Sequence, residues 1–344
     1  MSRMLDHLVC GSTFGALHAA ASSISGCRLI GVLGKGSSRT SSLAAAYGVP
    51  SITDINEVPR TSGGVASVAL RSPSLGGDSV EVALSLAERG WNVLVEGPLS
   101  KNDVTMIGKG CRKARTSFMV ANHYLNLPST HAFKKAAKKL LSLNLGSRHL
   151  EIRTTSQVLF HALSTVSELS LGGQLRVKGP VVDAGSYHVM PASFGRIPAL
   201  INIYNEIDPE KNDFNVRFTF GIKLTTEAGI LSMEDTGEGV TWQPSMRLTG
   251  VDDKGLPTAD PSLMVSHPLV SAPLKPIHRW ISDEWVNAIA VDITRCSVSN
   301  WKDPGHVTRS MFVAESWQTA SSAVGFPTAA STNSAIAIRA EDLA

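Results

Sequence analysis

The first 122 residues alternate apolar segments with helical ones, and this alternation is the feature that most constrains the fold. Strands are predicted at continuous apolar runs, namely DHLVCG, CRLIGVLG, VASVALRS, WNVLVEG and TSFMVAN. Helices are predicted between them, at FGALHAAASSI, SRTSSLAAAYG, DSVEVALSLAERG and from Val104 to Arg115. This alternation implies right-handed crossovers, so we expect a parallel, doubly wound Rossmann sheet over residues 1–122.

The pattern changes after residue 122. Extended segments dominate from Leu175 onward. FNVRFTFGIKLT alternates apolar with polar residues, as a strand with one buried and one solvent-exposed face does. We therefore predict a C-terminal α+β domain over residues 123–325, built on a mostly antiparallel sheet. Two late helices are expected, at RWISDEWVNAIAVDI and HVTRSMFVAESWQTA. Residues 326–344 lack bulky anchors and are predicted to form a loose tail.

Composition narrows the class of protein. The 344 residues are 43% hydrophobic and carry a net charge of +3, which gives no reason to expect a nucleic-acid partner. We find no secretory signal and no apolar run long enough to span a bilayer, so we expect a cytoplasmic protein without a membrane partner. The four cysteines are scattered and are expected to be reduced. No histidine spacing indicates a metal site.

The first predicted strand ends in CGSTFGA, from Cys10 to Ala16. The dinucleotide fingerprint is G-x-G-x-x-G/A, and Thr13 replaces its middle glycine here. Gly11 would make the tight turn, Gly15 would leave room for the backbone, and the amides of Thr13 and Phe14 would open a helix whose N-terminus attracts pyrophosphate. We expect Gly11, Ser12, Thr13, Phe14 and Gly15 to bind the coenzyme; an ordinary strand–helix turn is the alternative.

The second predicted strand ends in GVLGKGSSRT, where an NAD site places an acidic residue on the ribose. No acidic residue lies between Leu29 and Leu43. Two cations and two hydroxyls are present instead, those of Lys35, Ser37, Ser38 and Arg39. This set suits a ribose 2′-phosphate, so we predict NADP(H) as the coenzyme. A solvated basic turn that caps the next helix is the alternative, and both can hold together.

Two more strand ends complete the predicted crevice. Arg71 and Ser72 follow the strand VASVAL, where the nicotinamide half of a dinucleotide passes; Arg71 is equally compatible with an exposed surface position. Glu96, Gly97 and Pro98 end the strand WNVLVEG in the stretch LVEGPLSK, and we expect Glu96 and Pro98 to contact the coenzyme there. Because Gly97 has no side chain, any proton donor at this edge must come from elsewhere.

These motifs resemble those of a known enzyme family. VCGSTFG, GVLGKGSSR, RSPSLGG, VEGP and NHYLNLPS are similar, in order and spacing, to motifs of the thiazolinyl imide reductases of siderophore assembly lines. That family is a branch of the glucose-fructose oxidoreductase-like (Gfo/Idh/MocA-like) superfamily. The resemblance covers roughly the first 145 residues and implies NADPH, a Rossmann domain with a C-terminal α/β domain, and a homodimer. It also implies reduction of a thiazoline C=N bond to a thiazolidine on a siderophore or nonribosomal peptide intermediate tethered to a carrier protein.

The family places Glu-His-Pro at the end of the fifth strand and Tyr-Pro-His-Leu-Pro after the sixth, around its proposed proton donor. The positions that match are Glu96, Pro98, Tyr124, Leu127 and Pro128. Gly97 stands where the family has histidine, and Leu125 and Asn126 replace its Pro-His pair. The resemblance therefore assigns the reaction to a site that lacks one of its expected donors.

Imine reduction needs a hydride at carbon and a proton at nitrogen, so the protein has to position the substrate and supply one proton. We predict Tyr124 as the donor, directly or through a water in the volume that Gly97 leaves; a wall residue of the cleft is the alternative. Glu96 is expected to accept backbone hydrogen bonds rather than to orient a water. His123 is predicted to be a poor substitute, because successive side chains of an extended segment point apart.

Some alternatives stay open. Asp183, Gly185 and His188 approximate the Asp-x-Gly-x-His motif of sugar dehydrogenases, but no helical pattern follows, so we interpret the match as chance. The chain is alternatively a reductase of another imine or a carbonyl compound, or a catalytically eroded NADP-binding partner of an assembly line. One broad face of a predicted helix carries four lysines, Lys134, Lys135, Lys138 and Lys139. This face is either a docking surface for an acidic carrier protein or simply a solvent-exposed face.

Overall fold

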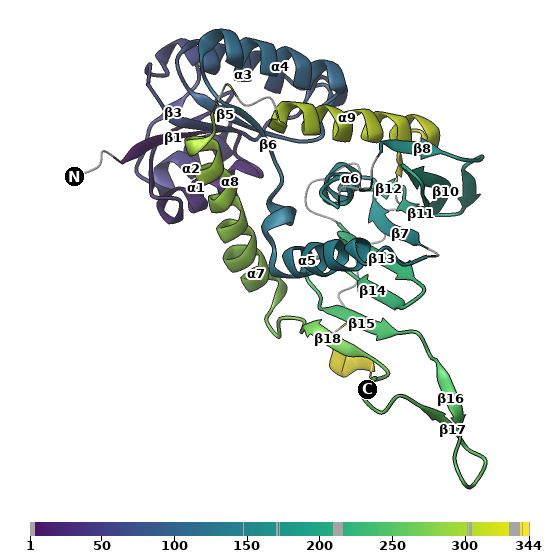
Figure 1. Ribbon diagram of the computed structural model, residues 1–344. Helices are drawn as coiled ribbons and strands as arrows, with labels where there is room; N and C mark the ends of the chain where they lie inside the picture. Colours follow the sequence, from purple (N-terminus) through teal and green to yellow (C-terminus); the bar gives the residue numbers. More distant parts are fainter. Residues whose placement is uncertain are drawn as a thin grey trace.

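The computed structural model describes residues 4–146, 148–169, 171, 173–208, 216–300, 302, 305–329, 338 and 340–343. Two large sheets organise the chain, and the helices α8 and α9 run between them (Figure 1). The first sheet has six strands, and all of its pairings are parallel. In spatial order they are β3 (Ser51–Ile52), β2 (Cys27–Leu33), β1 (Leu5–Cys10), β4 (Val65–Val68), β5 (Asn92–Glu96) and β6 (Phe118–Ala121). The predicted Rossmann sheet is confirmed.

Both faces of the first sheet are covered, which explains why its strands are apolar without interruption. Val93 and Val95 of β5 face α3 (Ser79–Glu88), α4 (Lys101–Ala114) and α9 (Gly305–Val324), whereas Leu94 faces α1 (Gly15–Ile24) and α8 (Val286–Val298). The two late helices predicted from the sequence therefore return from the second sheet to cover the first (Figure 1).

The second sheet is mostly antiparallel, as predicted, with a parallel pairing between β7 and β11. Its order is β18 (His267–Val270), β15 (Val240–Pro244), β14 (Gly229–Met233), β13 (Phe220–Thr226), β7 (His149–Thr155), β11 (Ile197–Tyr204), β10 (Tyr187–Phe194) and β8 (Leu175–Val177), with β9 (Val182–Ala184) on β10. The helices α5 (Pro128–Ser142) and α6 (Leu159–Ser167) cover one face and bury its apolar residues. The sequence pattern did not reveal β10, because YHVMPASF alternates poorly and contains a proline.

Two smaller pairings lie outside the large sheets. The hairpin of β16 (Leu248–Val251) and β17 (Pro257–Ala259) projects away from the body (Figure 1). β12 (Glu206–Ile207) pairs with β19 (Thr328–Ala329), within the predicted tail. Most of that tail lies outside the described residues, so the prediction of a loose segment stays untested.

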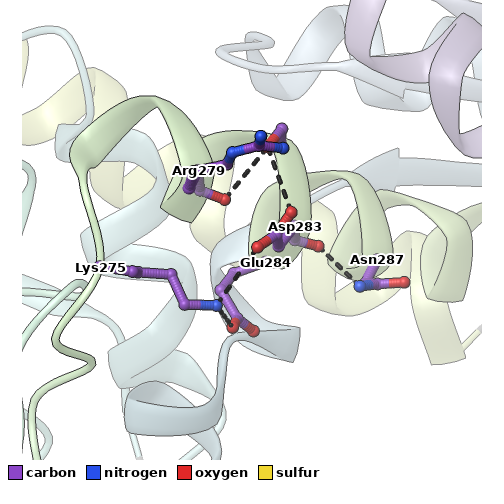
Figure 2. A network of polar contacts seen from close by, with 6 residues as sticks. Lys275, Arg279, Asp283, Glu284 and Asn287 are labelled. Atoms are coloured by element: carbon purple, nitrogen blue, oxygen red, sulfur yellow. Dashed lines mark hydrogen bonds and ion pairs between the residues drawn. The ribbon is translucent and has the colours of Figure 1, made fainter.

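The segment that leads back to the first sheet is held by a polar network (Figure 2). Lys275 Nζ lies 2.9 Å from Glu284 Oε1 and 3.4 Å from Asp283 Oδ2, and Asn287 Nδ2 donates to the Asp283 carbonyl oxygen at 2.7 Å. Between the short helix α7 (Ile277–Trp280) and α8, the turn η4 (Ile281–Trp285) has π-helical hydrogen bonding. Insertions of this kind recur at functional sites, and this one ends at Trp285, whose ring packs into the cluster of rings described below.

Three further observations concern composition and ligands. In the described part of the chain, no helix is both long and apolar enough to cross a membrane. Nor does the described part bring together three His, Cys, Asp or Glu side chains in a way that could hold a metal ion. The four cysteines are free and buried.

Candidate active site

The loop between β1 and α1 lies at the carboxyl edge of the first sheet and depends on its glycines. Gly11 has φ of 96°, and a Cβ there would lie 2.4 Å from the carbonyl oxygen of Ala69. A Cβ on Gly15 has less conflict, 3.0 Å from Val9 Cγ1. A larger residue at position 11 would therefore push β1 and β4 apart, so this position has to be glycine.

The N-terminus of α1 fits an anionic ligand. Its N-cap residue, Phe14, provides no side-chain hydrogen bond, whereas Ser37 and Ser100 cap α2 (Ser38–Ala46) and α4. The first amides of a helix need an acceptor, and a pyrophosphate can supply it. The loop geometry and the uncapped helix thus fit a dinucleotide with the residues that the sequence predicted.

The predicted phosphate-binding turn lies beside this loop. Arg39 Nη1 donates to Thr13 Oγ1 at 2.9 Å, and Thr40 Oγ1 donates to Ser12 Oγ at 3.1 Å. Ser37 caps the helix that Ser38 begins, as the alternative interpretation of this turn expected. The structure therefore brings Ser12, Thr13 and Arg39 together.

Lys35 has a partner that the sequence did not reveal. Its Nζ lies 2.8 Å from Asp78 Oδ2, and this hydrogen bond is the main reason why the pKa of Lys35 is raised. Asp78 precedes α3, far from Lys35 in the sequence. An acidic side chain is thus present at this turn after all, supplied by a neighbouring element.

Ser72 and Arg71 lie between β4 and α3. Ser72 is buried, and its hydroxyl oxygen has no hydrogen-bond partner among the described residues. The carbonyl oxygen of Arg71 accepts from the amide of Ser79 at 3.2 Å. A buried hydroxyl without a partner at this strand end is compatible with a ligand that approaches the sheet edge.

Glu96 has a different partner from the expected one. Its Oε1 lies 2.8 Å from His18 Nε2, a side-chain contact rather than the predicted backbone contacts at the loop. His18 is fully buried on α1, one turn after the dinucleotide loop, and its Nδ1 has no partner in the described structure. Sequence reasoning missed His18 because an isolated histidine in an alanine-rich helix carries no motif.

Gly97 does not leave an open volume. A Cβ on Gly97 would lie 2.7 Å from Cδ1 and 2.8 Å from Cε1 of Phe160, a buried residue of α6. The expectation that a water fills the space of the missing histidine is therefore wrong, because an aromatic ring from the second part of the chain occupies it. The peptide bond from Gly97 to Pro98 is cis.

Tyr124 and His123 lie on a 3-10 helix, η3 (His123–Asn126), rather than on an extended segment. Their ring centroids are 4.0 Å apart. The prediction that His123 points away from Tyr124 is thus wrong, because the helical turn places both side chains in the same buried cluster. His123 is buried, and neither of its ring nitrogens has a hydrogen-bond partner within the described chain.

A buried cluster of rings joins the two parts of the chain at this point. His161 of α6 lies 5.1 Å from Tyr124, Trp285 of η4 lies 4.8 Å from His123, and Phe14 of the dinucleotide loop lies 5.4 Å from His123, measured between ring centroids. His161 and Trp285 were not among the predicted site residues. Neither carries a local sequence signal, since both enter the site only through the packing of α6 and α8.

Burial sets the protonation of this ring cluster. It lowers the pKa of His123 well below the usual value, with the neighbouring His161 and His18 adding to the effect. Burial also lowers the pKa of His161, against the opposing effect of Glu96. The pKa of Tyr124 is raised by burial first, then by the charges of Asp235 and Glu96. At neutral pH His123 and His161 are therefore uncharged and Tyr124 holds its proton.

The alternative histidine motif does not form a site of this kind. Asp183 and His188 lie opposite each other on the antiparallel strands β9 and β10, and no helix follows. The expectation that no helix follows this motif is confirmed.

Comparisons with known proteins agree with the fold. Residues 5–122 match the family described as "Oxidoreductase family, NAD-binding Rossmann fold" (GFO_IDH_MocA). No curated protein matches the chain in sequence. Among solved structures, KijD10, a 3-ketoreductase from Actinomadura kijaniata in complex with NADP and TDP-benzene, is similar with a TM-score of 0.65, 12% identity and coverage of 96% of this chain and 100% of that chain.

Two other structures show the same likeness. GenD2 from gentamicin A biosynthesis, in complex with NAD, has a TM-score of 0.64 and 15% identity over 94% of this chain and 95% of that chain. An oxidoreductase from Agrobacterium radiobacter, in complex with NAD+, L-tartaric acid and magnesium, has a TM-score of 0.63 and 12% identity over 93% and 97% of the two chains. At these identities the likeness shows a shared fold, and it extends over both sheets.

Proposed function

We propose that this chain, whose residues 5–122 are an NAD(P)-binding Rossmann domain of the Gfo/Idh/MocA oxidoreductase family, is an NADPH-dependent reductase of a C=N bond. The substrate that we favour is a thiazoline on a carrier-tethered siderophore or nonribosomal peptide intermediate. The observation that supports a reductase is the convergence of the dinucleotide loop, the Glu96–His18 pair and the protonated Tyr124 on one buried cluster of rings.

The coenzyme would lie along the carboxyl edge of the first sheet. Gly11 to Gly15 would hold the pyrophosphate, and Arg39, with Ser37 and Ser38, would hold the ribose 2′-phosphate. Lys35 can join them only if it exchanges Asp78 for the phosphate, a modest change because both side chains of this pair are at the surface. When bound, NADPH supplies the hydride, and the protein has to position the substrate and deliver a proton.

Tyr124 is the group that we assign to proton delivery. Its raised pKa keeps the phenol protonated at neutral pH, so it can donate a hydrogen bond to the imine nitrogen and release its proton as that nitrogen gains electrons. The neutral His161 lies beside it and can relay a proton from solvent to the phenolate, gaining a proton at one ring nitrogen while it gives up the proton on the other. The product is an amine with one new C–H and one new N–H bond.

A second candidate, reduction of a carbonyl compound, is favoured by one observation. Phe160 fills the position that the histidine takes in the family that the sequence resembles, so the donor set differs from that family's. A phenol and a neutral imidazole serve an oxygen atom as well as a nitrogen atom.

The test is NADPH oxidation with a synthetic thiazoline thioester, and with a ketone of similar size. We expect Tyr124→Phe to lower kcat by about 10²–10⁴-fold while the Kd for NADPH stays within about twofold, since a proton donor acts on the reaction rather than on coenzyme binding. Tyr187→Phe is the matched control, because Tyr187 lies on β10, outside this cluster. Turnover of the ketone but not the thiazoline would select the second candidate, and no turnover of either would refute a reductase.

We also propose two partners. The helix-free face of the second sheet carries Glu151, Arg153 and Lys223 beside the half-buried Leu200, and we propose that it forms the interface of a homodimer, which sedimentation would test. Lys135, Lys138 and Lys139 of α5 are exposed and remain available for an acidic carrier protein. Charge reversal at Lys135 and Lys138 should then raise KM for a carrier-bound substrate but leave turnover of the free thioester unchanged.

A further inference from the structure

A cavity of about 290 Å³ lies beside the outer edge of β6, the last strand of the first sheet. Its walls come from β6, η3, α5, α6, α8 and α9, so both parts of the chain enclose it. None of the residues assigned above to the coenzyme or to proton delivery lines it. The cavity therefore has its own lining, although Phe160 borders both the cavity and Gly97 at the carboxyl edge of the sheet.

Cationic side chains outnumber acidic ones around this cavity. Lys134, Arg295 and Arg309 line it together with Glu168 and Asp292, which leaves one positive charge in excess when all five are ionised. Lys134 is half-buried and does not belong to the exposed lysine face of α5. Its pKa is lowered by burial first; the charge of Glu168 opposes this shift, and the positive charges of Lys138, Arg295 and Arg309 add to it. An anion between these groups would relieve their repulsion.

The cations are held in place. Arg309 Nη1 donates to Glu168 Oε1 at 2.6 Å, Arg295 Nη1 donates to Asn126 Oδ1 at 2.8 Å, and Lys134 Nζ donates to the carbonyl oxygen of Leu125 at 3.4 Å. Each contact uses only part of the donor capacity of the group. Anchored cations with spare donors resemble a prepared binding site more than a set of mobile surface charges, because little side-chain entropy remains to be lost on binding.

The inner wall offers a polar group without a partner. Asn122 is buried, and neither its Nδ2 nor its Oδ1 has a hydrogen-bond partner among the residues that the structure describes. Its backbone amide is fixed by Asp292 Oδ2 at 2.9 Å. A buried amide that faces a cavity costs free energy unless a water or a ligand satisfies it.

The rest of the inner wall is apolar. Met119, Phe160 and Val313 are buried there, whereas Arg295 and Arg309 are exposed at the surface end. The volume is near the lower limit of the range typical of small-molecule sites, about 300 Å³. An occupant should therefore be small, apolar at one end and singly negative at the other.

We infer that this cavity is a second ligand site, which binds a small organic monocarboxylate whose apolar part is about the size of a six-membered ring. The carboxylate lies among Lys134, Arg295 and Arg309, and the apolar part lies against Phe160 and Val313. One negative charge matches the single positive charge in excess. This site does not depend on the proposed reductase activity, so it can be tested without turnover.

The experiment is calorimetric titration of the full-length protein with benzoate, and with benzamide as a neutral molecule of the same shape. We expect saturable binding of benzoate and none of benzamide. Lys134→Met should weaken benzoate binding by about tenfold, whereas Lys139→Met, the same change at an exposed position on a different face of the same helix, should leave it within about twofold. Ser164→Leu, which places a larger side chain in the cavity, should abolish binding.

Thermal melting of each variant shows whether it is folded, and Lys134→Met should melt no lower than the wild type because it removes a half-buried charge. Several results would overturn the inference. They are equal binding of benzamide, tighter binding of phenyl phosphate than of benzoate, displacement of benzoate by NADPH, or a folded Ser164→Leu variant that binds as the wild type does. No saturable binding of benzoate up to about 10 mM would overturn it as well.

Discussion

Gly97→Ala is the substitution for which the structure gives the clearest expectation. The new methyl group would lie 2.7 Å and 2.8 Å from two ring carbons of Phe160, a separation that carbon atoms do not tolerate. Gly97 does not have a positive φ, so the backbone accepts alanine and the steric conflict is the whole effect. Phe160 cannot turn away freely, since its ring contacts His161 and Trp317.

The magnitude follows from overpacking of a buried contact. Forcing a methyl group into a filled core costs about 1–3 kcal/mol. For a chain of 344 residues, an unfolding entropy of about 2.1 cal/mol/K per residue means that each kcal/mol lowers Tm by about 1.4 °C, so Gly97→Ala should lower Tm by roughly 1–4 °C. Phe160→Leu alone should be destabilising through lost burial, but the double variant should be more stable than the sum of the two changes, by at least about 1 kcal/mol, because the smaller side chain makes room for the methyl group.

Thermal and urea unfolding of the four proteins would measure this coupling. Gly179→Ala is the matched control: Gly179 also precedes a proline, it has no positive φ, and its nearest neighbour to an added Cβ, on Pro191, is at an ordinary 3.8 Å. This control should keep the stability of the wild type or gain slightly. If Gly97→Ala proved as stable as Gly179→Ala, or if its effect added to that of Phe160→Leu without coupling, Phe160 would not fill the space at Gly97. The same contact predicts that Gly97→His gains no activity unless Phe160 is also reduced in size.

Three further predictions concern charges. Asp78→Asn should tighten NADPH binding by about two- to fivefold and leave NADH binding unchanged, because it releases Lys35 from a surface ion pair; equal effects on both coenzymes would exclude Lys35 from the 2′-phosphate site. Burial lowers the pKa of His7 to about 3, so the free energy of unfolding should keep its full value above the ordinary pKa of 6.5. Below that pH it should fall by up to about 1.4 kcal/mol per pH unit. Denaturant unfolding at several pH values should show a weaker dependence of this free energy on pH for His7→Gln. Burial raises the pKa of Asp292 to about 6, so the stability that its protonated form provides is lost as pH rises from about 4 through 6. Over this range the free energy of unfolding of the wild type should fall by up to about 3 kcal/mol relative to that of Asp292→Asn. A difference between the two proteins that does not change with pH would contradict a raised pKa of Asp292.

The sequence was a sufficient guide wherever a local pattern decides the structure. The Rossmann sheet follows from runs such as WNVLVEG, whose residues face helices on both sides of the sheet. The dinucleotide loop follows from Gly11, which the close approach of Ala69 requires. The mostly antiparallel second sheet was also predictable, because strands with one solvent-exposed face alternate apolar with polar residues.

The chemistry of the site was less predictable, because it depends on contacts between distant segments. Phe160 fills the space at Gly97, Asp78 pairs with Lys35, and His18 pairs with Glu96, and none of these pairs has a sequence signature. His123 was misjudged for a local reason. The sequence predicts an extended stretch after β6, but the chain forms a 3-10 helix there, which brings adjacent side chains together.

The ring cluster shows that the site belongs to the whole chain rather than to the Rossmann domain. Phe14 and Glu96 come from that domain, but His161 comes from α6 and Trp285 from η4, which the Lys275 network holds in position (Figure 2). Covering of the first sheet also depends on later residues, since Val286 and Ile293 of α8 bury the apolar face that Leu94 presents. Residues 1–122 alone would therefore expose that face to water, and they would lack four of the five rings, those of His123, Tyr124, His161 and Trp285. Such a fragment should aggregate or bind an apolar dye, whereas a soluble fragment that bound NADPH as tightly as the full chain would show that α8 is dispensable for the coenzyme crevice.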